Sequence, residues 1–201
     1  MIRIMVAEDM RMLRETLVAV LALEDDLEVV ASVDRGDAVV GAALSTRPDV
    51  AVIDIDLPGQ DGLTAAAELY ERLPGCRTLV LTGLAGPGHL RRALRAHASG
   101  FLLKHAPPQE LIDAIRRIAA GDRVVDPQVA LAALDTAASP LTAREADVLR
   151  IAATGAEPAE IAGRLSLSTG TVRNYLTAAE MKLGARNRVD AIRIATDAGW
   201  L

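Results

Sequence analysis

The chain has 201 residues, of which 51% are apolar, so it is long enough to bury one or two hydrophobic cores and is not a disordered tail. Its single cysteine, Cys76, excludes a disulfide framework and a cysteine-based metal cluster, and is typical of the reducing cytoplasm. A net charge of −5 argues against nucleic-acid binding over the whole surface, and no apolar run reaches the roughly 18 residues of a membrane span or forms a secretion signal.

Short apolar runs alternate with helical patterns up to about residue 121. The runs predict five strands, and apolar residues with a period near 3.6 predict a helix after each strand. Strands this short and apolar, separated by helices, indicate a parallel sheet covered on both faces, a doubly wound α/β domain of the flavodoxin-like kind. The predicted strands are Ile2–Ala7, Val29–Val33, Val50–Ile53, Thr78–Thr82 and Gly100–Leu103, and the helices are Met12–Leu23, Asp37–Ser45, Leu63–Leu73, Gly88–His97 and Pro108–Ala120.

The rest of the chain is predicted to be a linker followed by an all-α domain. Residues 122–139 mix small residues with one short helical pattern and end near a Ser-Pro pair, which is typical of a linker. Residues 140–201 predict four helices, and the short turn between the second and third indicates a helix-turn-helix. These helices run from the Thr142 cap to Ala153, from Pro158 to Leu165, from the Ser168 cap to Leu183, and from Val189 to Ala198.

The charge is distributed unevenly between these parts. Residues 1–135 carry 14 basic and 20 acidic side chains, whereas residues 136–201 carry 8 and 7. A nucleic-acid site is therefore expected only in the C-terminal part of the chain.

Charged and polar side chains follow four of the predicted strands. They are Glu8 and Asp9, Asp54, Thr82, and Lys104. Ligand sites of open parallel sheets lie at the carboxyl ends of the strands, so these residues are expected to meet at one rim. Each residue taken alone is more often a helix cap or a solvated charge, but their joint placement favours a site.

Three carboxylates close together repel one another, and a divalent cation relieves that repulsion. Oxygen ligands select a hard ion such as Mg²⁺, which also binds phosphate oxygens, so the rim predicts a magnesium and phosphoryl site. Asp54 ends the central strand and is the predicted nucleophile, whereas Glu8 and Asp9 would hold the metal. Lys104 and the Thr82 hydroxyl would bind phosphoryl oxygens, and Gly83 leaves the approach open.

These residues resemble the receiver domains of bacterial response regulators. The matching motifs are the acidic pair Glu8-Asp9, the segment Asp54-Ile-Asp-Leu-Pro58 followed by Gly62, then Thr82, and Phe101-Leu-Leu-Lys104. The resemblance implies that a sensor histidine kinase phosphorylates Asp54, and that Mg²⁺ binds Glu8, Asp9, Asp54 and the backbone carbonyl of Asp56. It also implies that Thr82 and Phe101 form a coupled switch pair. The chain departs from the pattern in the glycine-rich loop from Gly83 to Gly88, at His97 where glycine is common, and at His105 where an acidic residue is common.

The third C-terminal helix has the composition of a DNA-reading helix. Its residues Thr169, Thr171, Arg173, Asn174 and Thr177 fall outside the apolar stripe and suit base edges and phosphates of the major groove. Lys182, Arg186 and Arg188 extend a basic edge toward the DNA backbone, whereas Glu180 would repel it. Composition alone is weak support, because polar helix residues usually face solvent.

The segment from Leu141 to Arg188 resembles the LuxR-type helix-turn-helix of the NarL/FixJ family, and the strings GTVRNYL, LEDDLEVV and AGW are similar to its DesR-like branch. Thr177 stands where relatives often have a basic residue. The resemblance implies a transcription factor that dimerises on phosphorylation and binds double-stranded promoter DNA, with RNA polymerase as a further partner. Two-fold symmetry predicts paired half-sites about one helical turn apart or a multiple of that.

Two alternatives remain open from the residues. One is an orphan DNA-binding regulator whose receiver works without phosphorylation, in view of His97, His105 and the unusual loop. The other is a phosphatase similar to the haloacid dehalogenases, with Asp54 as nucleophile and Asp56 as general acid. Pro58 and the position of the motif on the third strand oppose the enzyme, so we expect a regulator.

Overall fold

The computed structural model describes residues 1–83, 87–126, 130 and 139–201. Its residues cluster into two compact units, one mainly N-terminal and one mainly C-terminal. The short helix predicted in the linker falls largely on residues 127–129 and 131–138, outside the described residues.

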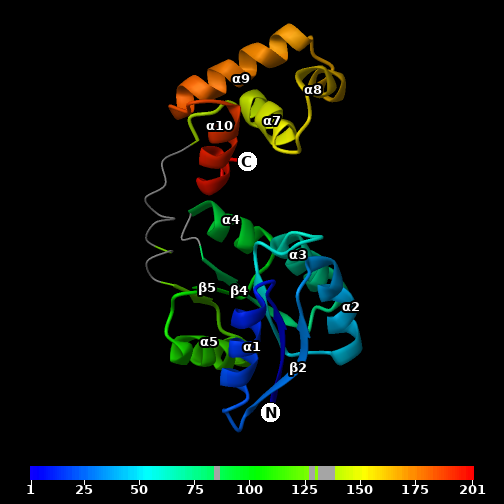
Figure 1. The fold of residues 1–201 in the computed structure, drawn as a ribbon, viewed down its shortest axis with the longest axis vertical. Helices are drawn as coiled ribbons and strands as arrows, with labels where there is room; N and C mark the ends of the chain where they lie inside the picture. The colour runs from blue at the N-terminus through cyan, green and yellow to red at the C-terminus, as the bar shows by residue number, and fades with distance from the viewer. Residues whose placement is uncertain (84–86, 127–129, 131–138) are drawn as a thin grey trace. The chain divides into compact units, whose positions relative to one another are not determined.

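The N-terminal unit is a parallel sheet in the order β2-β1-β3-β4-β5-β6 (Figure 1). This order matches the flavodoxin-like arrangement predicted from the sequence, extended by one strand. The strands are β1 (Ile2–Ala7), β2 (Leu27–Val33), β3 (Val50–Asp54), β4 (Arg77–Thr82), β5 (Gly100–Leu103) and β6 (Val124–Val125). The helices are α1 (Arg11–Leu21), α2 (Gly36–Thr46), α3 (Gly62–Arg72), α4 (Pro87–Arg95) and α5 (Pro108–Ala120).

The prediction of five strands was wrong by one. β6 pairs in parallel with β5, with Val124 opposite Gly100 and Val125 opposite Phe101. It lies within the segment expected to be linker, so the sheet extends past the predicted boundary at residue 121. A two-residue strand has no alternation long enough to read, and its hydrogen bonds to β5 form between residues more than twenty positions apart.

Helices cover the sheet because every central strand is apolar on both faces. Alternate residues Ile4 and Val6 of β1 join a core with Leu17 and Leu21 of α1 and with the apolar side of α5. Met5, between Ile4 and Val6, is fully buried on the opposite side, as is Ile53 of β3. Burial on both faces leaves the carboxyl ends of the strands as the polar edge of the sheet.

The C-terminal unit consists of the four predicted helices, α7 (Ala143–Ala152), α8 (Pro158–Leu165), α9 (Thr169–Leu183) and α10 (Arg188–Asp197). α7 begins with the predicted capping box, in which Thr142 and Glu145 bond each other's backbone N–H groups. Ser168 caps α9, and Gly184, with a φ of 61°, ends it. Val148, Leu149, Val172 and other apolar residues of the four helices form their own core.

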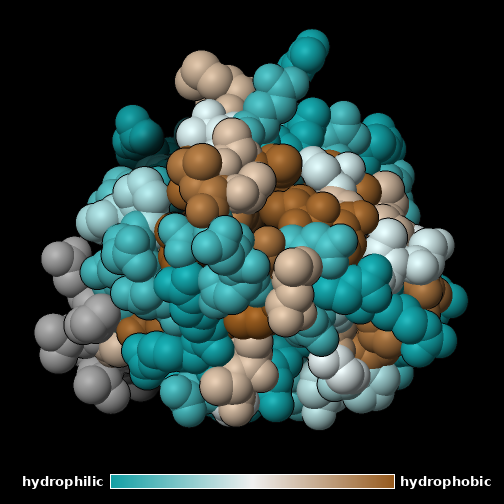
Figure 2. Space-filling model, turned by 90° about the horizontal axis from the view of Figure 1, so that it is seen from below, coloured by the Kyte–Doolittle hydropathy of each residue, from teal (hydrophilic) through white to brown (hydrophobic). Residues whose placement is uncertain are grey.

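Seen from the end that carries the N-terminus, hydrophobic residues gather in a limited area within a largely hydrophilic surface (Figure 2). Among the described residues, no helix is both long and apolar enough to cross a membrane.

Candidate functional site

The sheet brings the residues predicted for the rim together at the ends of its strands. Glu8 and Asp9 follow β1, Asp54 ends β3, Thr82 ends β4 and Lys104 follows β5. β1, β3, β4 and β5 are consecutive neighbours in the sheet, so these ends are adjacent. Ligand oxygens of Glu8, Asp9 and Asp54 lie within 4.8 Å of one another. The rim is therefore one cluster, built by strand order from positions up to 96 residues apart.

Lys104 connects the two buried carboxylates of this cluster. Its Nζ lies 2.9 Å from Asp54 Oδ2 and 2.9 Å from Glu8 Oε2. Glu8 is 1% exposed and Asp54 is 3% exposed, whereas Lys104 keeps 18% of its side chain in contact with solvent. One ammonium thus faces two carboxylates removed from water, which leaves the cluster with a net negative charge.

Burial governs the protonation of the cluster. Desolvation raises the pKa of Asp54 and of Glu8 above their ordinary values, against the lowering effect of the Lys104 ammonium. Burial also acts to lower the pKa of Lys104, but its hydrogen bonds to Asp54 and Glu8 outweigh this and raise it. The ion pairs therefore compensate only part of the cost of burying the carboxylates.

The cluster fits a divalent cation. Asp54 Oδ1 is buried and receives no hydrogen bond from the residues that the structure describes, an unusual state for a buried oxygen. The exposed carboxylate of Asp9 lies beside it, open to solvent. Hard oxygen ligands with access to water are what Mg²⁺ prefers. The donor set and the unpaired oxygen together support the predicted metal site.

The loop between β3 and α3 packs tightly behind Asp54. Gly62 donates its N–H to the Ile55 carbonyl over 2.8 Å, and a Cβ at Gly62 would lie 1.8 Å from the Asp54 carbonyl oxygen. Asp61 caps α3 through the N–H groups of Leu63 and Thr64 and forms an ion pair of 3.0 Å with Arg92 of α4. Asp56 is exposed in this loop. The glycine after the Asp54 motif is therefore required by close backbone approach.

The predicted switch residues are both buried. Thr82 is 0% exposed at the end of β4, and Phe101 is 1% exposed on the adjoining strand β5. The Phe101 ring therefore lies inside the domain in this structure, which is also what an ordinary core aromatic would do.

Of the three departures from the receiver pattern, His97 and His105 are exposed, and of the glycine-rich loop the structure describes only its two ends, with Gly83 exposed and Gly88 buried. Gly83 and His105 are exposed near the rim, after β4 and Lys104. His97 adopts a φ of 58°, a left-handed conformation in which glycine is normally favoured. Its ring stacks on Tyr70 of α3, with ring centroids 4.1 Å apart. None of the three removes a side chain from the carboxylate cluster.

Sequence reasoning missed Arg14 and Arg92, which contact backbone or loop groups around the cluster. Both lie on helices at positions that no motif marks.

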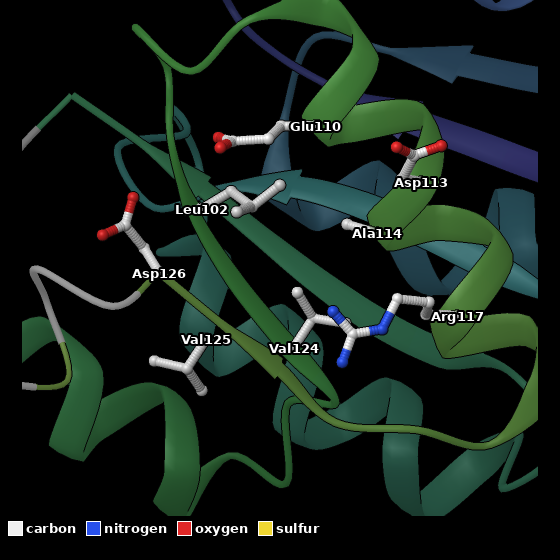
Figure 3. Close-up of a pocket in the computed structure, with 8 residues that line it drawn as sticks. All are labelled: Leu102, Glu110, Asp113, Ala114, Arg117, Val124, Val125 and Asp126. Atoms are coloured by element: carbon white, nitrogen blue, oxygen red, sulfur yellow. The ribbon is translucent and has the colours of Figure 1, made fainter.

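A cavity of about 370 Å³ lies away from the cluster, between α5 and the strands β5 and β6 (Figure 3). Glu110 and Asp126 flank Leu102 in it, whereas Arg117 lies beside Val124, so its lining carries both signs of charge.

On α9 the residues predicted to read DNA are mostly available. Arg173, Asn174 and Thr177 are exposed, whereas Thr169 and Thr171 are half-buried. Thr171 takes part in the cap, because its N–H donates to Ser168 Oγ over 3.1 Å and its hydroxyl lies 2.8 Å from the same oxygen. Among the predicted residues in the first half of the helix, Arg173 and Asn174 are therefore the two whose side chains are exposed to solvent.

Most cationic groups of the C-terminal unit already have acidic partners. Lys182 lies 2.7 Å from the buried carboxylate of Glu145, and Arg188 lies 3.9 Å from Glu157. Within residues 139–201 the structure gives no acidic partner to Arg144 or Arg173. The other paired cations of the unit are Arg150, Arg164, Arg186 and Arg193.

Comparison with protein families identifies both parts of the chain. Residues 4–116 match the response regulator receiver domain, and residues 139–195 match the luxR family of bacterial regulatory proteins. The first match covers the strands β1 to β5 that carry the carboxylate cluster, and the second covers nearly all of the four C-terminal helices, α9 included.

The chain also aligns with known regulators over nearly their whole length. The chain is 42% identical over 200 residues to the transcriptional regulatory protein DesR of Bacillus subtilis, covering 100% of this chain and 99% of DesR. It is 45% identical over 202 residues to the response regulator RamR of Streptomyces coelicolor, covering 100% and 98% of the two chains. Among solved structures, the response regulator ChrA of a heme-sensing two-component system matches with a TM-score of 0.60 at 34% identity, over 96% of each chain. RcsB dimers bound to DNA match in fold, with a TM-score of 0.71 at 24% identity, over 98% of each chain.

Proposed function

The chain belongs to the response regulators that join a receiver domain to a LuxR-type DNA-binding domain, and on that basis we propose that phosphorylation of Asp54 controls its binding to promoter DNA. The proposed receiver comprises residues 1–121 together with β6, and the proposed DNA-binding domain comprises residues 140–201. The remainder of residues 122–139 is the proposed linker.

One observation supports Asp54 above any other residue as the phosphoryl acceptor. Its carboxylate lies at the end of a central strand, 2.9 Å from the Lys104 ammonium and beside two further carboxylates, with Oδ1 unpaired among the described groups. Nucleophile, cation and metal ligands are thus within reach of one incoming phosphoryl group.

In the proposed transfer, a carboxylate oxygen of Asp54 attacks the phosphorus of a phosphohistidine on a sensor histidine kinase. An O–P bond forms, the N–P bond breaks, and its electron pair stays on the imidazole nitrogen. Lys104 and the Thr82 hydroxyl would bind the phosphoryl oxygens. Glu8, Asp9, Asp54 and the Asp56 carbonyl would hold Mg²⁺, which supplies positive charge to the transferring group.

The readout is proposed to pass through Thr82 and Phe101 to a change in dimerisation. A dimer presents two copies of α9 to paired half-sites, and the second contact gains from its high effective concentration. This gain matters here because few cations of the domain are free to contact phosphate. The proposed base and phosphate contacts are Thr169, Thr171, Arg173, Asn174, Thr177, Lys182 and Arg188, with RNA polymerase as the partner at the promoter.

The first test is phosphorylation of the full chain by acetyl phosphate with Mg²⁺, followed by intact-mass measurement. We expect one added phosphoryl group on the wild type and none on Asp54→Asn. Asp56→Asn is the matched control, because this exposed side chain is proposed to contribute only its backbone carbonyl. Labelling of Asp54→Asn, or an unlabelled wild type, would contradict the assignment of Asp54.

The second test measures binding to a promoter fragment and molecular mass, with and without acetyl phosphate, at a stated salt concentration. We expect phosphorylation to increase both the dimer fraction and the DNA affinity of the wild type but not of Asp54→Asn. Unchanged affinity and mass on full phosphorylation would favour the phosphorylation-independent regulator. Turnover of a phosphate ester that is lost in Asp56→Asn would favour the haloacid-dehalogenase alternative.

A further inference from the structure

The loop between β1 and α1 must direct two consecutive side chains, those of Glu8 and Asp9, toward the carboxylate cluster. Glu8 and Asp9 are consecutive residues, yet the structure brings carboxylate oxygens of both within 4.8 Å of Asp54. Consecutive side chains of an extended strand point to opposite faces, so the chain must leave the strand conformation between them. That turn takes the carbonyls of both residues out of the ladder of the sheet, and they need other donors.

Arg14 supplies those donors. From the first turn of α1, its Nη1 donates to the Glu8 carbonyl over 2.7 Å and to the Asp9 carbonyl over 3.2 Å. The N–H of Glu8 is bonded to the Val33 carbonyl of β2 over 3.1 Å. The peptide groups on both sides of the Glu8 side chain are therefore held, one by the neighbouring strand and the other by Arg14.

We propose that Arg14 is a positioning residue for the metal site, which fixes the loop so that the carboxylates of Glu8 and Asp9 face the same cation. This inference rests on the proposed function, because it assigns a role toward the Mg²⁺ that supports phosphorylation of Asp54. Arg14 bonds only the backbone of the two ligands, so its effect passes through the orientation of their side chains.

The charge of Arg14 makes this role separable from simple electrostatics. A guanidinium near a cation site repels the cation, so removal of its charge alone would strengthen Mg²⁺ binding. Loss of the two carbonyl bonds instead frees the loop and weakens binding, because the ligands must then be ordered by the metal itself. The two effects have opposite signs, and a positioning role requires that the second effect dominates.

The test is Mg²⁺ affinity of the full chain, measured by calorimetric titration without phosphodonor. Arg14→Gln and Arg14→Met both remove the charge and the paired donation, and Met retains an apolar stem of similar length. We expect each to raise the Kd for Mg²⁺ about tenfold, the lower end of the range for residues that orient metal ligands. With acetyl phosphate, we expect the Mg²⁺ concentration for half-maximal phosphorylation to rise similarly, with the rate at saturating Mg²⁺ retained.

Arg11→Gln is the matched control. Arg11 lies on the same helix three residues earlier, and its exposed side chain pairs with Glu15 over 2.7 Å. The Arg11→Gln variant loses one positive charge, as the Arg14 variants do. Because exposed charges are screened, we expect its Kd for Mg²⁺ to remain within about twofold of the wild type. Circular dichroism checks that each variant is folded, and either Arg14 variant alone suffices for the comparison.

An unchanged or lowered Kd in the folded Arg14 variants overturns the proposed positioning role while leaving phosphorylation of Asp54 intact. An equal rise of the Kd in Arg11→Gln also overturns it, because the loss of affinity would then not depend on the bonds from Arg14 to the two carbonyls. Failure of the proposed function has a different signature: the wild type itself would bind no Mg²⁺ and accept no phosphoryl group at Asp54.

Discussion

The ammonium of Lys182, near the end of α9, lies 2.7 Å from Oε2 of Glu145 in the first turn of α7. Glu145 is 7% exposed, and the same oxygen accepts the N–H of Thr142 in the capping box. The ion pair thus joins the helix proposed to read DNA to the cap of the first helix of its domain. Lys182 was also predicted to contact DNA. The structure shows only its ion pair with Glu145, so the DNA contact stays a prediction.

We expect Lys182→Met to destabilise the C-terminal unit by about 1 kcal/mol, because it leaves the buried Glu145 carboxylate without its cation; partial exposure of Lys182 limits the loss. Trp200 packs against the core of this unit and is the sole tryptophan of the chain, so its fluorescence during urea denaturation measures the change. Lys182→Met in a Glu145→Gln background is expected to cost much less. Unaltered stability with weakened DNA binding would instead identify Lys182 as a phosphate contact.

Glu145 also predicts a dependence of stability on pH. Despite burial, its hydrogen bonds with Lys182 and Thr142 hold the pKa of Glu145 below its ordinary value. A carboxyl with a lowered pKa in the folded state contributes stability above its ordinary pKa, and this contribution is lost as the pH falls through the folded pKa. We expect the Trp200-monitored unfolding free energy to fall more steeply below pH 4.5 in the wild type than in Glu145→Gln. Parallel curves for the two proteins would refute this.

The buried carboxyl of Asp54 is expected to give the stability of the receiver the opposite dependence on pH. Burial raises the pKa of Asp54 in the folded state, so its contribution favours folding below its ordinary pKa and is lost as the pH rises through the raised value. Without Mg²⁺, we expect Asp54→Asn to have a higher midpoint of thermal unfolding than the wild type at pH 8, and a smaller advantage at pH 5. Calorimetry at both pH values checks this. An advantage that grows on acidification would show that burial does not dominate at Asp54.

Alanine substitutions at Gly62 and Gly41 compare a glycine packed tightly against the backbone of Asp54 with one that has open space around it. A Cβ at Gly62 would meet the Asp54 carbonyl oxygen at 1.8 Å, whereas a Cβ at Gly41 has nothing within 4 Å. We expect Gly62→Ala to destabilise the receiver by about 2–3 kcal/mol, because backbone must move. Gly41→Ala, inside α2, is expected to stabilise by about 0.5–1 kcal/mol through helix propensity. Equal effects in denaturant titrations would mean that the loop yields without cost.

Arg173 is expected to dominate the electrostatic part of DNA binding. It is exposed on α9, and no ion pair to it occurs in the described part of the chain. Arg173→Ala is expected to weaken binding at least tenfold. If Arg173 contacts a phosphate, the slope of log K against log salt falls by about 0.9, and if it reads a base, sequence preference relaxes instead. Arg193→Ala is the control, because Arg193 pairs with Asp190 and Asp197 on α10; an equal loss there would contradict the special role of Arg173.

The sequence predicted the position of a residue best where that residue follows directly after a recognisable strand. Asp54 and Lys104 could be assigned to one rim because a parallel sheet gathers its strand ends. His97 could be marked as unusual where glycine is common, and its φ of 58° gives the physical reason. The stack on Tyr70 could not be predicted, because it depends on how α3 and the end of α4 pack.

The bonds that orient the side chains of the site and of the C-terminal unit also escaped prediction. The bonds from Arg14 run to backbone carbonyls, which leave no mark on residue identity. The pair of Lys182 and Glu145 joins positions 37 residues apart, and a basic residue near the end of a DNA-reading helix suggests a phosphate contact first. β6 was missed because two residues show no periodicity. Composition and spacing therefore predict the groups of the site better than the bonds that orient them.

The internal pairing of cations in the C-terminal unit has a consequence for how such a protein would find its target on a chromosome. A domain in which most cations are already paired with its own carboxylates gains little from the uniform charge of DNA, so its residence on random sequence would be brief. Search would then proceed through many short encounters, with little protein sequestered by the vast excess of other sites. Occupancy of a promoter would depend chiefly on contacts that only the correct sequence, and two protomers together, can complete.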